Sequence, residues 1–296
     1  MKFELESFRV GDLYYSQDVV RQVREISKAL IAYGQSRTDW QKHTSTSYLV
    51  SGLPGQGKSE LIRQVVNEIN RELAGLGRYT VIWKNYSVGR EIVTQSDLHE
   101  ALRDIQKSRE QNSDCLHLVS FDEIDKAKGF DFFTPFLSLL ESRITPDEAV
   151  TGWLFVQSSF QSLRQMTAYA EAIENKSLRD FLTRIQGGNV ELPNLRFSPV
   201  QRLVSGVGIL RSLYREATGL SFGLAAYLLS EYRIENIRSL FNAVSRNSRI
   251  DSEKHLQLAN AVFVHPLTLR GCEGASSVWT YFKPSVLTPN GSPHTE

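Results

Sequence analysis

The stretch with the clearest chemistry begins at Gly52 and ends at Lys58-Ser59, with the spacing G-x-x-x-x-G-K-S. Glycines at positions 52, 55 and 57 permit backbone conformations that a Cβ atom forbids, so that several N–H groups can point toward one phosphate. Lys58 is then expected to reach the β- and γ-phosphates of a nucleotide, and the Ser59 hydroxyl to ligate Mg²⁺. We interpret this stretch as a phosphate-binding loop.

The sequence on both sides of the loop fits this interpretation. An apolar run over residues 48–50 predicts a buried strand, and apolar residues at helical spacing predict a helix over residues 58–73. A helix N-terminus attracts phosphate because it presents free N–H groups and the positive end of the helix dipole. The residues expected to contact the nucleotide are Gly52, Pro54, Gly55, Gln56, Gly57, Lys58, Ser59 and Glu60.

A pair of carboxylates, Asp122 and Glu123, follows an apolar run that begins at residue 115. Ligands of parallel sheets bind beyond the carboxyl ends of the strands, so this pair is expected to face the phosphate-binding loop. Asp122 is expected to hold Mg²⁺ together with Ser59, and Glu123 to polarise the attacking water. Because a metal site needs the aspartate only, the second carboxylate points to hydrolysis. Taken without the loop, the pair could equally begin a solvated loop.

Strand and helix patterns alternate as far as residue 192, which predicts an α/β fold with a parallel sheet and helices on both faces. After Pro193 only helix patterns remain, at 200–217, 222–231, 235–246 and 252–263. We therefore expect an α/β nucleotide-binding domain over residues 1–195, with an N-terminal helix at 16–34, and a small α-helical lid domain over 196–265. Residues 266–296 are expected to form a C-terminal tail or linker.

Charge balance and the distribution of apolar residues indicate which partners and which compartment to expect. The 34 basic side chains balance 33 acidic ones, which gives no bulk electrostatic reason to bind nucleic acid or an acidic membrane. The N-terminus lacks the apolar core of a secretory signal, and the least charged stretch, 217–230, is too short to span a bilayer. We expect a cytoplasmic protein without a membrane partner.

These motifs, in this order, resemble the AAA+ ATPases, a branch of the P-loop NTPases. The phosphate-binding loop is followed by the acidic strand end at Asp122-Glu123, a polar strand end at Ser158-Ser159, an arginine at a helix end and a helical lid with a further arginine. The resemblance covers roughly residues 15–265. It implies a P-loop NTPase sheet, the AAA+ core, followed by the α-helical lid.

The resemblance also implies roles for single residues. Arg238 resembles the sensor-2 arginine, which reaches the γ-phosphate from the lid. Ser158 or Ser159 resembles sensor 1, and Ser159 is taken as the catalytic one. Arg184 resembles the arginine finger, with Arg179 as the alternative. Simpler roles stay open: a solvated helix face for Arg238, a helix C-terminal cap for Arg184 and a strand end for the serines.

The resemblance implies an AAA+ ATPase that uses ATP and Mg²⁺ in an oligomeric ring or spiral to remodel or switch a macromolecular partner. A finger arginine must come from a neighbouring copy, so we expect a homo-oligomer joined head to tail. The alternative is an ATP-dependent assembly platform that recruits DNA or an effector protein, similar to initiators, transposition regulators or defence-related members, with hydrolysis as a switch.

Two further hypotheses concern the substrate. Residues 86–89 follow the expected strand at 79–83 and could form an aromatic pore loop that pulls a protein segment, although an ordinary turn is the preferred interpretation. A small-molecule P-loop kinase is disfavoured, because such enzymes shield the phosphate from water and have no use for a base such as Glu123.

Overall fold

A computed structural model describes residues 8–11, 13–35, 47–75, 81–113, 115–141, 151–185, 187–213, 224–225, 227–228, 231 and 233–247. The contacts divide the chain into two compact units. The α/β unit contains Arg21–Pro54 and Lys58–Leu192, and the second, mainly helical unit contains Met1–Val20, Gly55–Gly57 and Pro193–Glu296. The helix expected at 252–263 and the tail expected at 266–296 lie outside the described residues.

The α/β unit is built on a sheet of five parallel strands, which confirms the predicted fold class. The strands lie in the order β4-β5-β6-β3-β7. Their bounds are β3 (Ser47–Ser51), β4 (Val81–Ser87), β5 (Leu116–Asp122), β6 (Thr151–Val156) and β7 (Asn189–Glu191). Because β6 lies between β3 and β5, its carboxyl end stands between the end of the phosphate-loop strand and the acidic pair.

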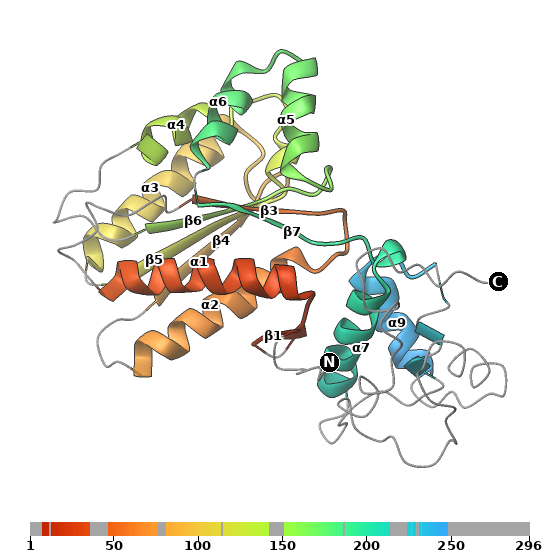
Figure 1. The fold of residues 1–296 in the computed structure, drawn as a ribbon. Coiled ribbons are helices and arrows are strands. Elements are labelled where there is room, and N and C mark those ends of the chain that lie inside the picture. The colour runs from red at the N-terminus through yellow and green to blue at the C-terminus, as the bar shows by residue number, and fades with distance from the viewer. Residues whose placement is uncertain are drawn as a thin grey trace, which may run out of the picture. The chain divides into compact units, whose positions relative to one another are not determined.

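Helices cover both faces of this sheet (Figure 1). One face carries α1 (Gln17–Gln35) and α2 (Lys58–Gly75), and Gly152 of β6 leaves room there for Leu30 of α1. The other face carries α3 (Gln95–Gln111), α4 (Thr134–Glu141), α5 (Leu163–Ala172) and α6 (Lys176–Arg184). The unit is therefore three layers deep, with the sheet in the middle.

Two elements begin or end away from their expected positions, and each has a local cause. Strand β4 runs to Ser87 rather than to residue 83, because as an edge strand it tolerates the polar residues Lys84 and Asn85. Helix α4 begins at Thr134, although the apolar pattern already begins at residue 130, because the Asp131 carboxylate accepts the N–H groups of Phe133 and Thr134 and so caps the helix there.

The core beneath the acidic pair is aromatic. Phe121, the residue before Asp122, is fully buried. Its ring stacks on the rings of Tyr86 and Phe155, with distances of 5.4 and 6.0 Å between ring centroids. It contacts the Phe136 ring edge to face, with 5.0 Å between the centroids. Such aromatic pairs stabilise the fold beyond the contribution that comes from burying their apolar surface. The carboxyl end of β5, which carries Asp122, is therefore held in position by aromatic packing.

Within the described residues, the helical unit includes a small hairpin and the helices α7 and α9. Its elements are β1 (Arg9–Val10), β2 (Leu13–Tyr14), the 3₁₀ turn η4 (Leu195–Phe197), α7 (Pro199–Leu213) and α9 (Ile237–Asn247). The Tyr14 carbonyl accepts hydrogen bonds from Ser205 at 2.8 Å and Gln201 at 3.4 Å, which ties the hairpin to α7. Among the helices within the described ranges, none has the length and apolar character that crossing a membrane requires.

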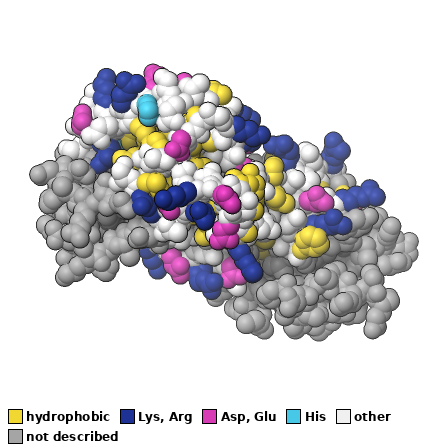
Figure 2. Space-filling model, turned by 90° about the horizontal axis from the view of Figure 1, so that it is seen from above, with side chains coloured by type: hydrophobic (Ala, Val, Ile, Leu, Met, Phe, Trp, Pro, Cys, Tyr) yellow, Lys and Arg dark blue, Asp and Glu magenta, His cyan; other side chains and the backbone are white. Residues whose placement is uncertain are grey.

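Charges of both signs are mixed on the surface. On the face drawn in Figure 2, lysine and arginine side chains stand among aspartate and glutamate side chains over the described part of the chain. This mixture agrees with the nearly zero net charge of the whole sequence.

The start of β7 approaches β3 closely enough to require glycine. A Cβ atom on Gly187 would lie 2.5 Å from the Ser47 carbonyl oxygen and 2.4 Å from the Tyr48 ring. We expect Gly187→Ala to destabilise the protein by about 1–3 kcal/mol, because backbone must move to relieve the overlap. Gly75→Ala, at the end of α2 with nothing within 4 Å, is the matched control and should be neutral or stabilising. Equal urea midpoints for the two variants would contradict this.

Candidate functional site

The phosphate-binding loop joins the end of β3 to the first residue of α2, as predicted. Gly55 and Gly57 have φ angles of 79° and 84°, in the left-handed region that side chains avoid. Within the helical unit, a Cβ atom on Gly55 would lie 3.2 Å from the Asn236 side chain, and one on Gly57 would lie 3.3 Å from Ile237. Both the conformation and the available space therefore favour glycine at these two positions.

Lys58 is the most unusual group of the site, because its side chain is buried with only 6% of its surface exposed. Its ammonium donates hydrogen bonds to the carbonyl oxygens of Gly52 at 2.7 Å and Leu53 at 2.9 Å. Burial lowers the pKa of Lys58, and the nearby carboxylates of Asp122, Asp125 and Glu123 act in the opposite direction. Among the described residues, the carboxylates that favour the charged form of Lys58 therefore all come from the end of β5 and the turn that follows it.

Ser59 and Asp122, the two residues predicted to hold Mg²⁺, are in direct contact. The exposed Ser59 hydroxyl donates to the Asp122 carboxylate at 2.5 Å, although the two residues are 63 positions apart. A hydroxyl and a carboxylate are hard oxygen ligands, which suits Mg²⁺. This donor set fits a magnesium ion bound with a nucleotide, because Mg²⁺ takes only one or two protein ligands at such sites.

Glu123 has a strained backbone. Its φ and ψ angles are 60° and 40°, in the left-handed region, where residues other than glycine are uncommon. Its carboxylate pairs with the Lys126 ammonium at 2.6 Å, and the two side chains are 23% and 49% exposed. Such an exposed pair contributes about 0–1 kcal/mol, so exchanging Lys126 for another partner costs little. Strain of this kind gathers at functional sites, and Glu123 is the predicted general base.

The polar end of β6 lies beside the acidic turn. Ser158 is buried and Ser159 is exposed, and both contact Asp125: the Ser158 N–H donates at 2.7 Å, and the Ser159 hydroxyl donates to the other carboxylate oxygen. The sequence predicted the serines but not their partner. A tight turn after β5 carries Asp125 toward β6, and the three-residue spacing from Asp122 was the only local signal.

The two candidate finger arginines lie on α6 in different surroundings. Arg184 is the last residue of the helix, and its guanidinium donates to the Leu137 carbonyl oxygen of α4 at 2.8 Å. This contact joins the end of α6 to α4. Arg179 is exposed and makes no side-chain hydrogen bond or ion pair within the described ranges. The finger role of either residue stays a prediction.

Arg238 lies in the helical unit, in the first turn of α9, and its side chain is exposed. The Asn236 side chain accepts the Ser239 N–H at 2.9 Å, and the Ser239 hydroxyl oxygen accepts the Asn236 N–H at 3.2 Å, so this helix begins with a reciprocal cap. The Arg238 N–H donates to the Gly55 carbonyl at 3.3 Å, a contact inside this unit. The sensor-2 role of Arg238 is a prediction that these contacts leave open.

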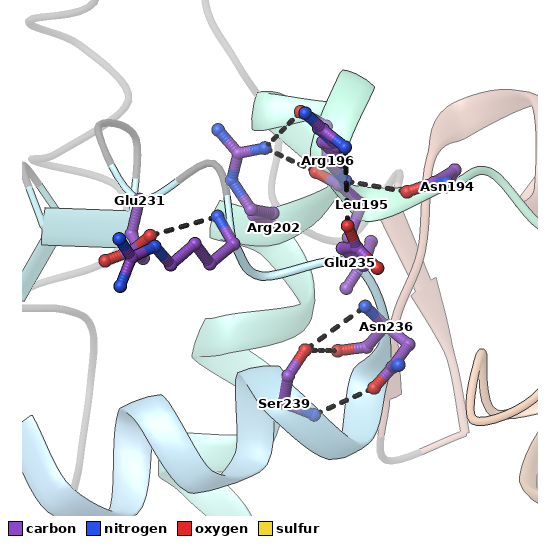
Figure 3. Close-up of polar contacts among 9 residues, drawn as sticks. Asn194, Leu195, Arg196, Arg202, Glu231, Glu235, Asn236 and Ser239 are labelled. Carbon is purple, nitrogen blue, oxygen red and sulfur yellow. Dashed lines mark hydrogen bonds and ion pairs between the residues drawn. The ribbon is translucent and has the colours of Figure 1, made fainter.

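A buried arginine, which the sequence analysis missed, holds the segment before α7 (Figure 3). Arg202 is 3% exposed and donates to the carbonyl oxygens of Leu195 and, at 2.9 Å, Arg196. It also donates to the Leu228 carbonyl oxygen at 2.7 Å. Burial lowers the pKa of Arg202 to about 10. The Leu195 N–H also donates to the Glu235 carbonyl at 3.1 Å, so the chain just before α9 and the turn η4 are held together.

The other predicted residues of the loop are placed as follows. Pro54 is exposed and Gln56 is buried. The Glu60 carboxylate accepts from Arg63 and Gln64; burial raises its pKa, but these hydrogen bonds outweigh burial and lower it. Tyr86 lies inside β4 rather than in a loop, and its hydroxyl donates to Asp104 at 2.7 Å. Nothing in this placement favours a pore loop at Tyr86.

Comparisons with known proteins give one family match. Residues 48–132 match the model of the ATPase family associated with various cellular activities (AAA). A search of curated proteins gave no significant match.

Several solved structures are similar. C. elegans PCH-2 is 15% identical over 72% of this chain and 52% of its own, with a TM-score of 0.43. The ORC1 protein of Aeropyrum pernix, in complex with DNA, is 13% identical over 87% of this chain and 68% of its own, with a TM-score of 0.48. A Thermotoga maritima RuvB variant is 16% identical over 85% of this chain and 71% of its own, with a TM-score of 0.47. Thus the chain spans about half the length of PCH-2, and these similarities are too distant to assign a function.

Substitution of Lys58 tests whether the loop binds the phosphates of ATP. In Lys58→Ala the phosphates lose a charged donor worth about 3 kcal/mol or more, so ATP should bind about 100-fold more weakly or not measurably. Isothermal titration calorimetry measures this. Lys84→Ala is the matched control, because Lys84 pairs with Asp104 at 2.5 Å and not with the phosphate-binding loop. Unchanged affinity in Lys58→Ala would remove the phosphate-loop interpretation.

Proposed function

Because this chain has the core of an AAA+ ATPase, we propose that it binds ATP with Mg²⁺ and hydrolyses it to ADP and phosphate. The family match over residues 48–132 confirms the resemblance inferred from the motifs and supports ATPase activity in general. The observation that carries the finer proposal is the contact between Ser59 and Asp122, beside the buried ammonium of Lys58. These three groups suit a nucleotide that arrives with its metal ion.

Binding replaces contacts that the protein already makes. The phosphates take the place of the Gly52 and Leu53 carbonyl oxygens on the Lys58 ammonium, which exchanges two neutral acceptors for anionic ones. Ser59 and Asp122 would hold Mg²⁺, and the ion would supply Lewis-acid stabilisation of charge on the β- and γ-phosphate oxygens. The first turn of α2 offers its free N–H groups to the same anion.

Glu123 acts as the general base. Its carboxylate leaves Lys126 and accepts a proton from the attacking water, whose oxygen forms a bond to the γ-phosphorus as the bond to the β-phosphate oxygen breaks. Ser159, at the neighbouring strand end, contacts this water. The products are ADP and inorganic phosphate, and no further reactant is required.

The proposed active unit is a homo-oligomeric ring or spiral in which α6 of one copy completes the site of the next. This arrangement requires a head-to-tail interface. Arg184 is the predicted finger, and its contact with Leu137 would have to open for that role; the exposed Arg179 is the alternative. Hydrolysis in such an assembly serves to remodel or switch a macromolecular partner, and we propose a protein substrate or effector as that partner.

Glu123→Gln separates chemistry from binding. The amide keeps the shape but cannot accept the proton, and losses of general-base catalysis run to about 10²–10⁴-fold in rate. We therefore expect slow phosphate release with ATP affinity retained, measured by a coupled phosphate assay and by calorimetry. Glu100→Gln, an exposed glutamate on α3, is the matched control and should behave as wild type. If Glu123→Gln turns over normally, another group activates the water.

Mixing two inactive variants tests the finger. An arginine finger is worth about 10³–10⁵-fold in rate, so Arg184→Ala should bind ATP and hydrolyse it very slowly. Lys58→Ala keeps its finger but cannot hold ATP. Mixed oligomers of the two should recover part of the activity, because a Lys58→Ala copy can complete the site of an Arg184→Ala neighbour.

Arg179→Ala is carried through the same experiment in parallel. If Arg184→Ala is active by itself, while Arg179→Ala is inactive and recovers on mixing, then Arg179 is the finger. If neither variant recovers in oligomers shown by mass spectrometry to be mixed, α6 does not supply a finger in trans.

A further inference from the structure

The turn after β5 carries a third carboxylate, Asp125, beyond the two that the motif predicts. Asp125 accepts two hydrogen bonds from the end of β6, on different carboxylate oxygens. The Ser158 N–H lies 2.7 Å from Oδ1, and the Ser159 hydroxyl donates to Oδ2. The contact crosses between neighbouring strands, because β5 and β6 are paired in parallel up to Phe121 and Phe155.

A turn holds each end of this contact in place. The 3₁₀ turn η3 (Ile124–Lys126) follows the left-handed Glu123, and the fully buried Ile124 anchors it in the core. On the other strand, the Gln157 side chain is fully buried, donates to the Phe160 carbonyl at 2.5 Å and accepts the Phe160 N–H at 2.8 Å. This second turn fixes where Ser158 and Ser159 stand.

The chemistry of the groups fixes the direction of the hydrogen bonds. A carboxylate has no proton to give, so the single proton of the Ser159 hydroxyl points to Asp125. The lone pairs of Ser159 then face other partners, and the hydroxyl can only accept from them. A γ-phosphate oxygen cannot donate a hydrogen bond, but a water molecule can.

We propose that Asp125 is a positioning residue, which turns the Ser159 hydroxyl into an acceptor for the attacking water while its other oxygen holds the β6 end through Ser158. The inference rests on the proposed hydrolysis of ATP and deepens it. It assigns Ser159 to the water rather than to the γ-phosphate. Glu123 and Ser159 then accept the two protons of one water molecule, which directs a lone pair of its oxygen toward phosphorus.

The electrostatic effect of Asp125 on Lys58 supports a place for Asp125 near the phosphate-binding loop. Asp125 is one of three carboxylates that raise the pKa of the buried Lys58 against the effect of burial. Its charge therefore acts on the loop that holds the phosphates, and its hydrogen bonds act on the strand end beside that loop.

Asp125→Asn separates the two tasks of the residue. The amide oxygen still accepts the Ser158 N–H, which can only donate, so the amide NH₂ group must face Ser159. The Ser159 hydroxyl then accepts from the amide, and its proton is free to point elsewhere. Asp125→Ala removes both contacts. A merely structural role would leave Asp125→Asn like wild type and affect only Asp125→Ala.

The expected result for Asp125→Asn is a fall in kcat of about 10–100-fold, as for other outer partners of catalytic groups, with KM for ATP nearly unchanged. Ser159→Ala should fall to a similar degree. The double variant should be no slower than either single one, because the two residues act as one unit. Asp131→Asn is the matched control, since Asp131 also accepts two backbone N–H groups but contacts neither serine.

A measurement without nucleotide accompanies the kinetics. Hydrogen exchange of the Ser158 amide should stay slow in Asp125→Asn and become fast in Asp125→Ala. Thermal unfolding and ATP affinity of Asp125→Asn should match those of wild type.

The outcomes distinguish the two levels of the proposal. Wild-type turnover together with normal kcat in Asp125→Asn overturns the role of Asp125 alone. Additive losses in the double variant overturn the coupling to Ser159. Absence of ATP turnover in wild-type oligomers overturns the proposed function and, with it, this inference.

Discussion

Lys58 carries a buried ammonium group, and the end of the sheet is arranged around it. A buried charge is costly unless hydrogen bonds and opposite charges compensate it. Two carbonyl oxygens of the phosphate-binding loop, 2.7 and 2.9 Å away, supply the hydrogen bonds, and the carboxylates at the end of β5 supply the charge. Neither kind of partner is as good as a phosphate, because the carbonyls are neutral and the carboxylates act from a distance. An anion bound in the loop would therefore compensate the Lys58 charge better than its present partners do.

The order of the strands determines which other groups lie at the same end of the sheet as Lys58. Because β6 lies between β3 and β5, the serines at its end stand between the loop and the acidic turn. Ser59 reaches Asp122 across that end of the sheet, and Asp125 reaches Ser158 and Ser159. The aromatic packing around Phe121 holds β5 in place beneath these contacts.

Much of the fold and of the candidate site could be predicted, because the sequence patterns that indicate them are local. Three glycines before Lys58, an apolar strand before Asp122 and helical spacing after Ser59 each lie within a short window of sequence. The missed features depend on distant contacts. Asp125 meets Ser159, 34 residues further on, and Arg184 meets the Leu137 carbonyl, 47 residues back. Helix α4 starts later than the apolar pattern that begins at residue 130, because the Asp131 carboxylate caps the helix further along the chain.

We propose that nucleotide and metal replace the internal partners of Lys58 and Ser59. A crystal or cryo-electron microscopy structure with Mg²⁺ and a non-hydrolysable ATP analogue is the most direct test. In that structure we expect the Lys58 ammonium to leave the Gly52 and Leu53 carbonyl oxygens for the β- and γ-phosphates, and the Ser59 hydroxyl to leave Asp122 for the metal ion. A structure with the analogue bound elsewhere, while Lys58 keeps both carbonyl contacts, would contradict it.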